Sequence, residues 1–232
     1  MDLAGVDVLA FDVFGTVVDW HSSVAAEVTE LGLPVDGSRF ALAWRARYAP
    51  TLRRVAAGEL GWAPLDELHR IMLEECLDEF GVHELDEEQK RHLTGAWHRL
   101  RPWPDSVEGL TRLKRRYVIS TLSNGNIGLL TRMAKHAGLP WDCILSAENF
   151  QRYKPDPATY LGVGRVFGVE PSRVLMVAAH HDDLEGARSH GLLTAYVERP
   201  LEFGPDGKDV SPEPATTLHV RDLRDLADRL GC

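Results

Sequence analysis

The sequence predicts an α/β protein with a doubly wound parallel sheet into which a helical block is inserted. Two observations lead to this prediction. After residue 105, apolar runs typical of buried strands alternate with helical patterns, which indicates a parallel sheet with helices on both faces. Between about His21 and Arg99 only helical patterns occur, although an apolar run over residues 6–11 precedes them. The first strand would therefore join the later strands in one sheet.

The inserted block is expected to contain four helices, over about residues 21–32, 38–50, 64–81 and from 86 onward. In the first helix, Val24, Val28 and Leu31 recur at helical spacing. Ser38 is the expected N-cap of the second helix. Pro50 should kink or stop that helix, because proline cannot donate the backbone hydrogen bond of a helix interior.

A linker rich in proline, Arg101-Pro102-Trp103-Pro104, precedes the alternating part of the chain. Strands are expected there over residues 117–122, 143–146, 174–178 and 192–197, with helices between them. Residues 222–230 have the amphipathic pattern of a terminal helix. The stretch 198–214 is rich in glycine, proline and aspartate and is predicted to be a surface loop.

The composition limits the classes of function. The net charge of −9 argues against a general nucleic-acid-binding protein, which needs a basic face. No apolar run approaches the roughly 18 residues of a membrane helix, and the start Met1-Asp2 lacks the basic flank of a secretory signal. Cys76, Cys143 and Cys232 form neither a zinc-ligand pattern nor an evident disulfide framework. We therefore expect a cytoplasmic protein without a membrane or nucleic-acid partner.

Polar residues follow the ends of several predicted strands. They are Asp12, Thr16, Ser123, Asn124, Lys154, His180 and Asp183. Taken singly, each is explained as a helix cap, a turn residue or an exposed lysine. Ligands bind outside the carboxyl ends of strands in open α/β sheets, so the joint occurrence of these residues favours one crevice. Asp12 is then a candidate nucleophile, and Gly15 lets the backbone turn behind it.

The sequence resembles the haloacid dehalogenase (HAD) superfamily in four motifs, namely Asp12-x-x-Gly15-Thr16, Ser123-Asn124-Gly125, Lys154-Pro155-Asp156 and Asp183. The resemblance covers nearly the whole chain. It implies a HAD-like α/β fold, in which a doubly wound parallel sheet core carries an inserted all-helical cap domain. The core would comprise residues 1–16 and 101–232, and the cap domain residues 17–100.

Phe14 distinguishes between two chemistries of this superfamily. Its phosphatases have a second aspartate at this position, which protonates the leaving alkoxide and helps to bind magnesium. An alkoxide is a strong base and needs a proton donor, whereas a halide can leave as an anion. Phe14 therefore favours displacement at carbon, with no metal and no other cofactor, over metal-dependent phosphoryl transfer.

Two further positions resemble the type II (L-)2-haloacid dehalogenases. Trp44-Arg45 matches a tryptophan–arginine pair of that subfamily, whose arginine holds the departing halide. Tyr160 follows Lys154 at the spacing found in the subfamily. Taken alone, Arg45 is equally explained as a solvated surface residue, and Tyr160 as a core residue of a helix.

The last motif departs from the subfamily pattern. Many of these dehalogenases have serine and asparagine before the final aspartate, where this chain has Ala178, Ala179 and His180. The hydroxyl that would help to hold Lys154 is missing, and a titratable imidazole replaces an amide. A similar Ala-Ala-His variant is associated with some relatives that act on small haloacetates, including fluorinated ones.

The resemblance implies a hydrolytic dehalogenase of short 2-haloalkanoic acids, such as haloacetates and 2-halopropionates, that forms an aspartyl ester and releases 2-hydroxy acids. Asp12 would attack, Lys154 and Thr16 would orient it, and Asp183 or His180 would activate water. The residues expected to bind the halogenated carboxylate are Phe14, Arg45, Ser123, Asn124 and Tyr160. Two alternatives stay open: a phosphatase or phosphonatase of a small phosphorylated metabolite, and a non-catalytic relative that binds small acids. A homodimer is expected because relatives are often dimeric.

Overall fold

The computed structural model describes residue 3 and residues 5–232. Its main sheet has six parallel strands in the order β5-β4-β1-β6-β7-β8. The strands are β1 (Val8–Phe11), β4 (Val118–Ser123), β5 (Cys143–Ser146), β6 (Val174–Ala178), β7 (Leu193–Val197) and β8 (Leu218–Val220). The predicted doubly wound sheet is confirmed, and β8 is an edge strand that the sequence pattern missed. β1 lies between β4 and β6, where the strand order reverses.

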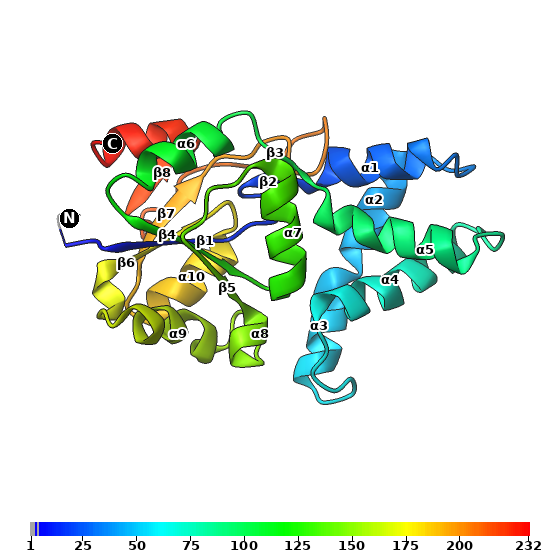
Figure 1. Ribbon diagram of the computed structural model, residues 1–232, viewed down its shortest axis with the longest axis horizontal. Coiled ribbons are helices and arrows are strands. Elements are labelled where there is room, and N and C mark those ends of the chain that lie inside the picture. The colour runs from blue at the N-terminus through cyan, green and yellow to red at the C-terminus, as the bar shows by residue number, and fades with distance from the viewer. Residues whose placement is uncertain (1–2, 4) are drawn as a thin grey trace.

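Helices cover both faces of this sheet (Figure 1). One face packs against α6 (Ser106–Leu113), α7 (Ile127–Ala137) and α11 (Leu223–Arg229), and the other against α9 (Pro157–Phe167) and α10 (His181–Ser189). The short helices α8 (Ala147–Phe150) and η2 (Pro171–Arg173) lie in the connections. Successive residues of a strand point to opposite faces, so Leu9 and Phe11 join the first core and Val8 and Ala10 the second. This two-sided burial explains why β1 is an uninterrupted apolar run.

The block between β1 and β4 is helical, as expected, and extends to one side of the sheet (Figure 1). Its helices are α1 (Trp20–Glu30), α2 (Gly37–Ala46), α3 (Tyr48–Ala56), α4 (Leu65–Glu79), α5 (Glu87–Thr94) and η1 (Gly95–His98). We call these residues, 20–98, the helical block. No helix of the described residues is both long enough and apolar enough to cross a membrane.

The predicted second helix begins two residues earlier than expected, and the interruption expected at Pro50 falls at Arg47. Its N-cap is Asp36, whose side chain accepts a hydrogen bond from the backbone of Arg39, and not Ser38. The helix breaks at Arg47, and Pro50 lies in the first turn of the next helix, α3. Proline is tolerated there because the first N–H groups of a helix have no partner within it.

A small antiparallel pair joins the helical block to the sheet. β2 (Val18–Asp19) and β3 (Arg101–Pro102) hydrogen-bond to each other where the chain enters and leaves the block. Trp103 also donates its backbone N–H to the carbonyl of Val17. The two chain segments that connect the sheet to the helical block are thus held side by side. The division into a cap domain of residues 17–100 and a core of the remaining residues stays a prediction.

The 198–214 stretch is irregular, but it is not simply a surface loop as predicted. Arg199 and Glu202 are buried in it, with exposed fractions of 6% and 0%. Arg199 donates two hydrogen bonds to Asp105, at 2.8 and 2.7 Å, and one to the carbonyl of Thr16 at 2.8 Å. A loop that carries such a buried ion pair is fixed against the core of the protein.

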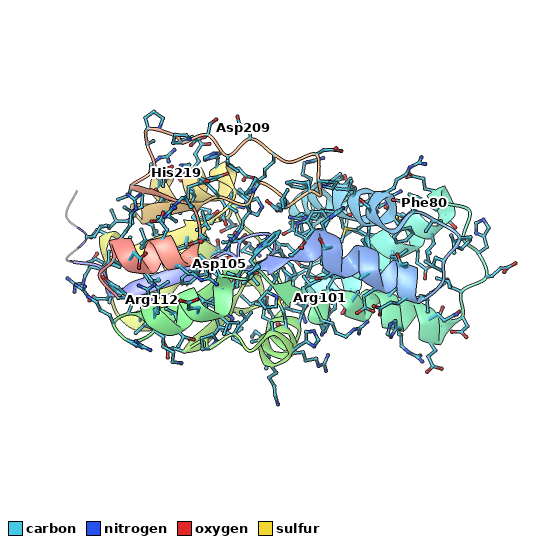
Figure 2. The ribbon with its side chains drawn as sticks, turned by 90° about the horizontal axis from the view of Figure 1, so that it is seen from above. Phe80, Arg101, Asp105, Arg112, Asp209 and His219 are labelled. Carbon is cyan, nitrogen blue, oxygen red and sulfur yellow. The ribbon has the colours of Figure 1, made fainter. Side chains whose placement is uncertain are left out.

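Asp105 provides a test of this anchoring. It lies beside the start of α6 (Figure 2) and also accepts the backbone N–H of Leu223. Asp105→Asn leaves the buried guanidinium of Arg199 without its counter-charge, so we expect a loss of about 3 kcal/mol in the free energy of unfolding, measured by urea denaturation.

Asp228→Asn is the matched control, because Asp228 pairs with Arg112 on the surface. Exposed ion pairs contribute little, so this variant should unfold like the parent protein. Equal stabilities for the two variants would contradict the anchoring role of the Asp105–Arg199 pair.

Candidate active site

The carboxyl ends of β1, β4 and β6 meet at one edge of the sheet, and each is followed by polar residues. Asp12 follows β1, Asn124 follows β4 and His180 follows β6. They line a cleft of about 1210 Å³. The opposite wall of the cleft comes from α2 and α3 of the helical block, including Arg45 and Tyr48. The crevice expected from the strand order is therefore present at the point where that order reverses.

Asp12 lies among three donors. Lys154 Nζ is 3.1 Å from its Oδ1, and Thr16 Oγ1 and His180 Nδ1 are 2.8 and 3.2 Å from its Oδ2. Burial by itself raises the pKa of Asp12, but the charge of Lys154 and the hydrogen bonds from His180 and Thr16 outweigh it and hold the pKa well below its usual range. Asp12 is therefore an ionised carboxylate, as a nucleophile must be.

Lys154 also binds the second carboxylate of the cleft. Its Nζ is 2.5 Å from Asp183 Oδ2, and the hydroxyl of Tyr160 donates to Asp183 Oδ1 at 2.8 Å. Burial lowers the pKa of Lys154, yet the charges of Asp12 and Asp183 raise it overall, so the lysine stays charged. Burial raises the pKa of Asp183, the charge of Asp12 adds to this, and Lys154 compensates only in part. The two carboxylates thus differ in basicity, which is typical of a nucleophile and base pair.

His180 connects Asp12 to a residue that the sequence analysis did not identify. Its Nε2 lies 2.8 Å from Oε1 of Glu202. Burial lowers the pKa of His180, but hydrogen bonds to Asp12 and Glu202 outweigh it and raise the pKa to about 9. Glu202 also accepts from Lys208 Nζ. No motif marks Glu202 in the sequence, because an irregular loop brings it against His180 behind the cleft lining.

The helical block contributes a cation and a hydroxyl to the cleft. The guanidinium of Arg45 lies 4.1 Å from the ring centroid of Tyr48. The hydroxyl of Tyr48 accepts from Asn124 Nδ2 at 2.8 Å, and Asn124 Oδ1 accepts the backbone N–H of Lys154 at 2.8 Å. Tyr48, three positions after Arg45, was also missed by the sequence analysis. These contacts connect the block to the strand-end residues.

Nearly all of the predicted residues come together. Those that line the cleft are Asp12, Phe14, Arg45, Asn124, Lys154, Tyr160, His180 and Asp183. Thr16 lies behind Asp12, where it donates to Asp12 and accepts the backbone N–H of Ala179. Ser123 is buried at the end of β4 and does not line the cleft, since its Oγ accepts the backbone N–H of Gly125 at 3.2 Å.

Phe14 replaces a polar group in the floor of the cleft. Its ring packs edge-on against Trp97 and His69, at centroid distances of 5.9 and 6.4 Å. The side chain at this position can therefore neither donate a proton nor bind a metal. Among residues 3 and 5–232 there is no group of three or more His, Cys, Asp or Glu side chains arranged to hold a metal ion.

Comparisons with known proteins agree with this geometry. Residues 6–191 match the family model described as haloacid dehalogenase-like hydrolase. (S)-2-haloacid dehalogenase 4A of Burkholderia cepacia is 31% identical over 197 residues, which cover 82% of this chain and 81% of the relative. The defluorinating L-2-haloacid dehalogenase Rha0230 has a similar structure, with a TM-score of 0.95, 43% identity and coverage of 98% and 96% of the two chains. The L-2-haloacid dehalogenase of Xanthobacter autotrophicus with chloropropionic acid covalently bound is also similar, with a TM-score of 0.82, 27% identity and coverage of 97% and 98%.

The raised pKa of His180 predicts a pH-dependent stability. The folded protein holds this proton more tightly than the unfolded chain, so its stabilising contribution is complete below about pH 6.5 and is lost as pH rises through about 9. Between these two pH values, the free energy of unfolding of the parent protein should fall further than that of the His180→Gln variant, by at most about 3 kcal/mol. Urea denaturation at several pH values measures the difference, and parallel curves for the two proteins would contradict it.

Proposed function

Since the chain belongs to the haloacid dehalogenase-like hydrolases, we propose that it hydrolyses short 2-haloalkanoic acids, such as haloacetates and 2-halopropionates, to 2-hydroxy acids and halide. The relatives reported above carry names of this activity, and one of them holds chloropropionic acid covalently. The cleft of this chain contains an ionised carboxylate and cations that suit a small organic anion.

The observation that carries the proposal is the pairing of Asp12 with Phe14. Asp12 is ionised and faces the cleft, while the aromatic ring two residues later offers no proton to a leaving group. Phosphoryl transfer to water needs help for the leaving alkoxide, whereas a halide needs none. The phosphatase alternative therefore lacks a proton donor for the alkoxide at the position two residues after Asp12.

In the proposed first step, a carboxylate oxygen of Asp12 displaces halide from C2 of the substrate and forms an ester. Lys154 and Thr16 hold the nucleophile in position through the contacts described above. A single displacement inverts a chiral carbon, so an (S)-2-haloacid would give an (R)-2-hydroxy acid.

The polar groups around Asp12 divide the remaining binding roles. We propose that Asn124 and backbone amides near Phe14 hold the substrate carboxylate, while Ser123, which lies outside the cleft, supports the loop that follows β4. Arg45 would receive the halide, since its guanidinium lines the opposite wall of the cleft. Tyr160 acts through Asp183, to which it donates a hydrogen bond.

In the second step, water attacks the ester carbonyl of Asp12. Two groups are candidates for activating this water: Asp183, which binds the same lysine as Asp12, and His180, which contacts Asp12 itself. A homodimer, expected from the resemblance, remains a prediction.

A halide-release screen tests the activity directly. Fluoro-, chloro- and bromoacetate and both enantiomers of 2-chloropropionate are offered in a pH-indicator assay with and without EDTA, together with phosphate esters. We expect halide release that EDTA does not affect. Phosphate release that depends on magnesium would instead support the phosphatase alternative, and tight binding of a haloacetate without turnover would support the non-catalytic one.

Asp12→Asn should abolish halide release, by about 10³-fold or more, because an amide is not a nucleophile at neutral pH. The measurement is chloride release from chloroacetate in single turnover. Asp182→Asn is a suitable control, since Asp182 lines the same cleft but has no assigned role. Near-normal turnover by Asp12→Asn would contradict the proposal.

Single turnover in oxygen-18 water locates the attack of water. Hydrolysis of the ester at its acyl carbon places the label in Asp12 first, and the hydroxy acid carries an oxygen from the enzyme. Mass spectrometry of the peptide that contains Asp12 detects the label. Direct incorporation into the product would show that water attacks the substrate itself.

A further inference from the structure

Glu202 is a fully buried carboxylate that the proposed steps do not yet use. The loop after β7 brings it against His180, which lines the cleft, and also reaches α1 (Figure 1), where Trp20 Nε1 lies 3.3 Å from its Oε1. The same Oε1 contacts His180 Nε2 at 2.8 Å, and Oε2 accepts from Lys208 Nζ. Lys208 is held in turn by the carbonyl of Ala179 at 2.8 Å. A buried carboxylate with these donors has a fixed position and charge.

Gly15 makes this approach possible. Its φ is +82°, and a Cβ atom added there would lie 2.1 Å from Glu202 Oε1. The glycine of the first motif therefore leaves room for Glu202 as well as allowing the turn.

The geometry determines the protonation of His180. Each ring nitrogen faces the oxygen of an ionised carboxylate, Nδ1 that of Asp12 and Nε2 that of Glu202. Ionised carboxylates only accept hydrogen bonds, so both nitrogens must donate and the ring is an imidazolium. The pKa of about 9 agrees with this. Lys154 also binds Asp12, and Lys208 also binds Glu202. Among residues 3 and 5–232, the ring of His180 hydrogen-bonds to no charged group other than these two carboxylates.

The two oxygens of Asp12 have different surroundings. Oδ2 accepts hydrogen bonds from Thr16 and His180, whereas Oδ1 contacts Lys154. Oδ1 is therefore the less encumbered oxygen and the one expected to attack carbon. After ester formation, Oδ2 is the carbonyl oxygen, and it becomes negatively charged when water adds to the adjacent carbon.

We propose that Thr16 and the imidazolium of His180 form an oxyanion hole on Asp12 Oδ2 during ester hydrolysis, and that Glu202 is the positioning residue that keeps His180 protonated. This inference rests on the proposed function. Once Asp12 is esterified it no longer provides a charge to His180, so Glu202 is the carboxylate that remains. Donors already aimed at the oxygen that gains charge stabilise such a step most effectively.

The step balances as follows. The oxygen of water bonds to the acyl carbon of Asp12, and the carbonyl electron pair moves to Oδ2. When this pair returns, the bond from the acyl carbon to Oδ1 breaks, and Oδ1 leaves as the hydroxyl oxygen of the product. One proton of the water goes to that oxygen, and the other goes to Asp183 and then to solvent. An imidazolium cannot accept this proton, so water activation is assigned to Asp183.

Glu202→Gln tests the assignment in single turnovers of chloroacetate, with chloride and glycolate measured in the same samples. Chloride release, which reports ester formation, should stay within a few-fold of the parent. Glycolate release should slow by about 10²-fold at about pH 8, so that the ester accumulates and is seen in the mass of the intact protein. It should recover as pH is lowered to about 6, because His180 is then protonated without Glu202.

Glu198→Gln is the matched control. Glu198 precedes the same loop and pairs with a histidine, His219, at 2.7 Å, outside the cleft. Both steps and their pH dependence should match those of the parent protein.

Lys208→Met is a second test that acts in the opposite direction. It removes the lysine that binds Glu202 together with His180, so Glu202 then stabilises the charge of His180 alone. His180 should keep its proton to higher pH, and the pH at which ester hydrolysis declines should rise. If Glu202→Gln does not fold, as judged by circular dichroism, the shift in Lys208→Met decides alone.

Any one of three results would overturn the inference. The first is a rate of ester hydrolysis in the parent protein that rises with pH as His180 deprotonates. The second is equal slowing of ester formation and ester hydrolysis in Glu202→Gln at every pH, and the third is a pH profile of Lys208→Met that is unchanged or shifted to lower pH. A parent protein that releases no chloride from any haloacid would overturn the proposed function itself, and this inference with it. Normal chloride release with any of the three results would overturn the inference alone.

Discussion

The structure of the cleft depends on the neutralisation of buried charge. Asp12, Asp183 and Glu202 are carboxylates removed from water, and each is stable there only because a cation lies against it. Lys154 lies between Asp12 and Asp183, while His180 lies between Asp12 and Glu202. The shared cations fix the positions of the carboxylates. They hold the pKa of Asp12 below its usual range, whereas burial and the charge of Asp12 raise the pKa of Asp183 despite Lys154. Reactivity in this cleft is therefore a consequence of how charges are paired.

The surrounding fold brings these charges together from distant parts of the chain. Parallel pairing in register places the ends of β1 and β6 next to each other, so residues 168 positions apart, Asp12 and His180, are in contact. The helical block then supplies Arg45 and Tyr48, and Tyr48 accepts from Asn124 at a strand end. The cleft thus has one wall of strand ends and one of helices, and each wall carries a positive charge.

Local patterns were sufficient for much of this structure. The apolar runs predicted five of the six strands of the sheet, because strands buried on both faces must be apolar throughout. The motifs at strand ends predicted Asp12, Asn124, His180 and Asp183, which line the cleft, whereas Ser123 faces its own loop. The pattern failed where context decides: β8 is a short edge strand, and the N-cap of α2 is Asp36 instead of Ser38.

Local periodicity and residue type were enough to predict the sheet, the inserted helices and the chemical character of Asp12, Phe14 and Lys154. The positions of Glu202 and Tyr48 follow from the folded arrangement alone, because they depend on a loop without a motif and on the packing of the block against the sheet. The folded arrangement also decides that His180 is an imidazolium. Protonation depends on which groups surround a side chain in space, and here one of them is contributed by a loop predicted to lie on the surface.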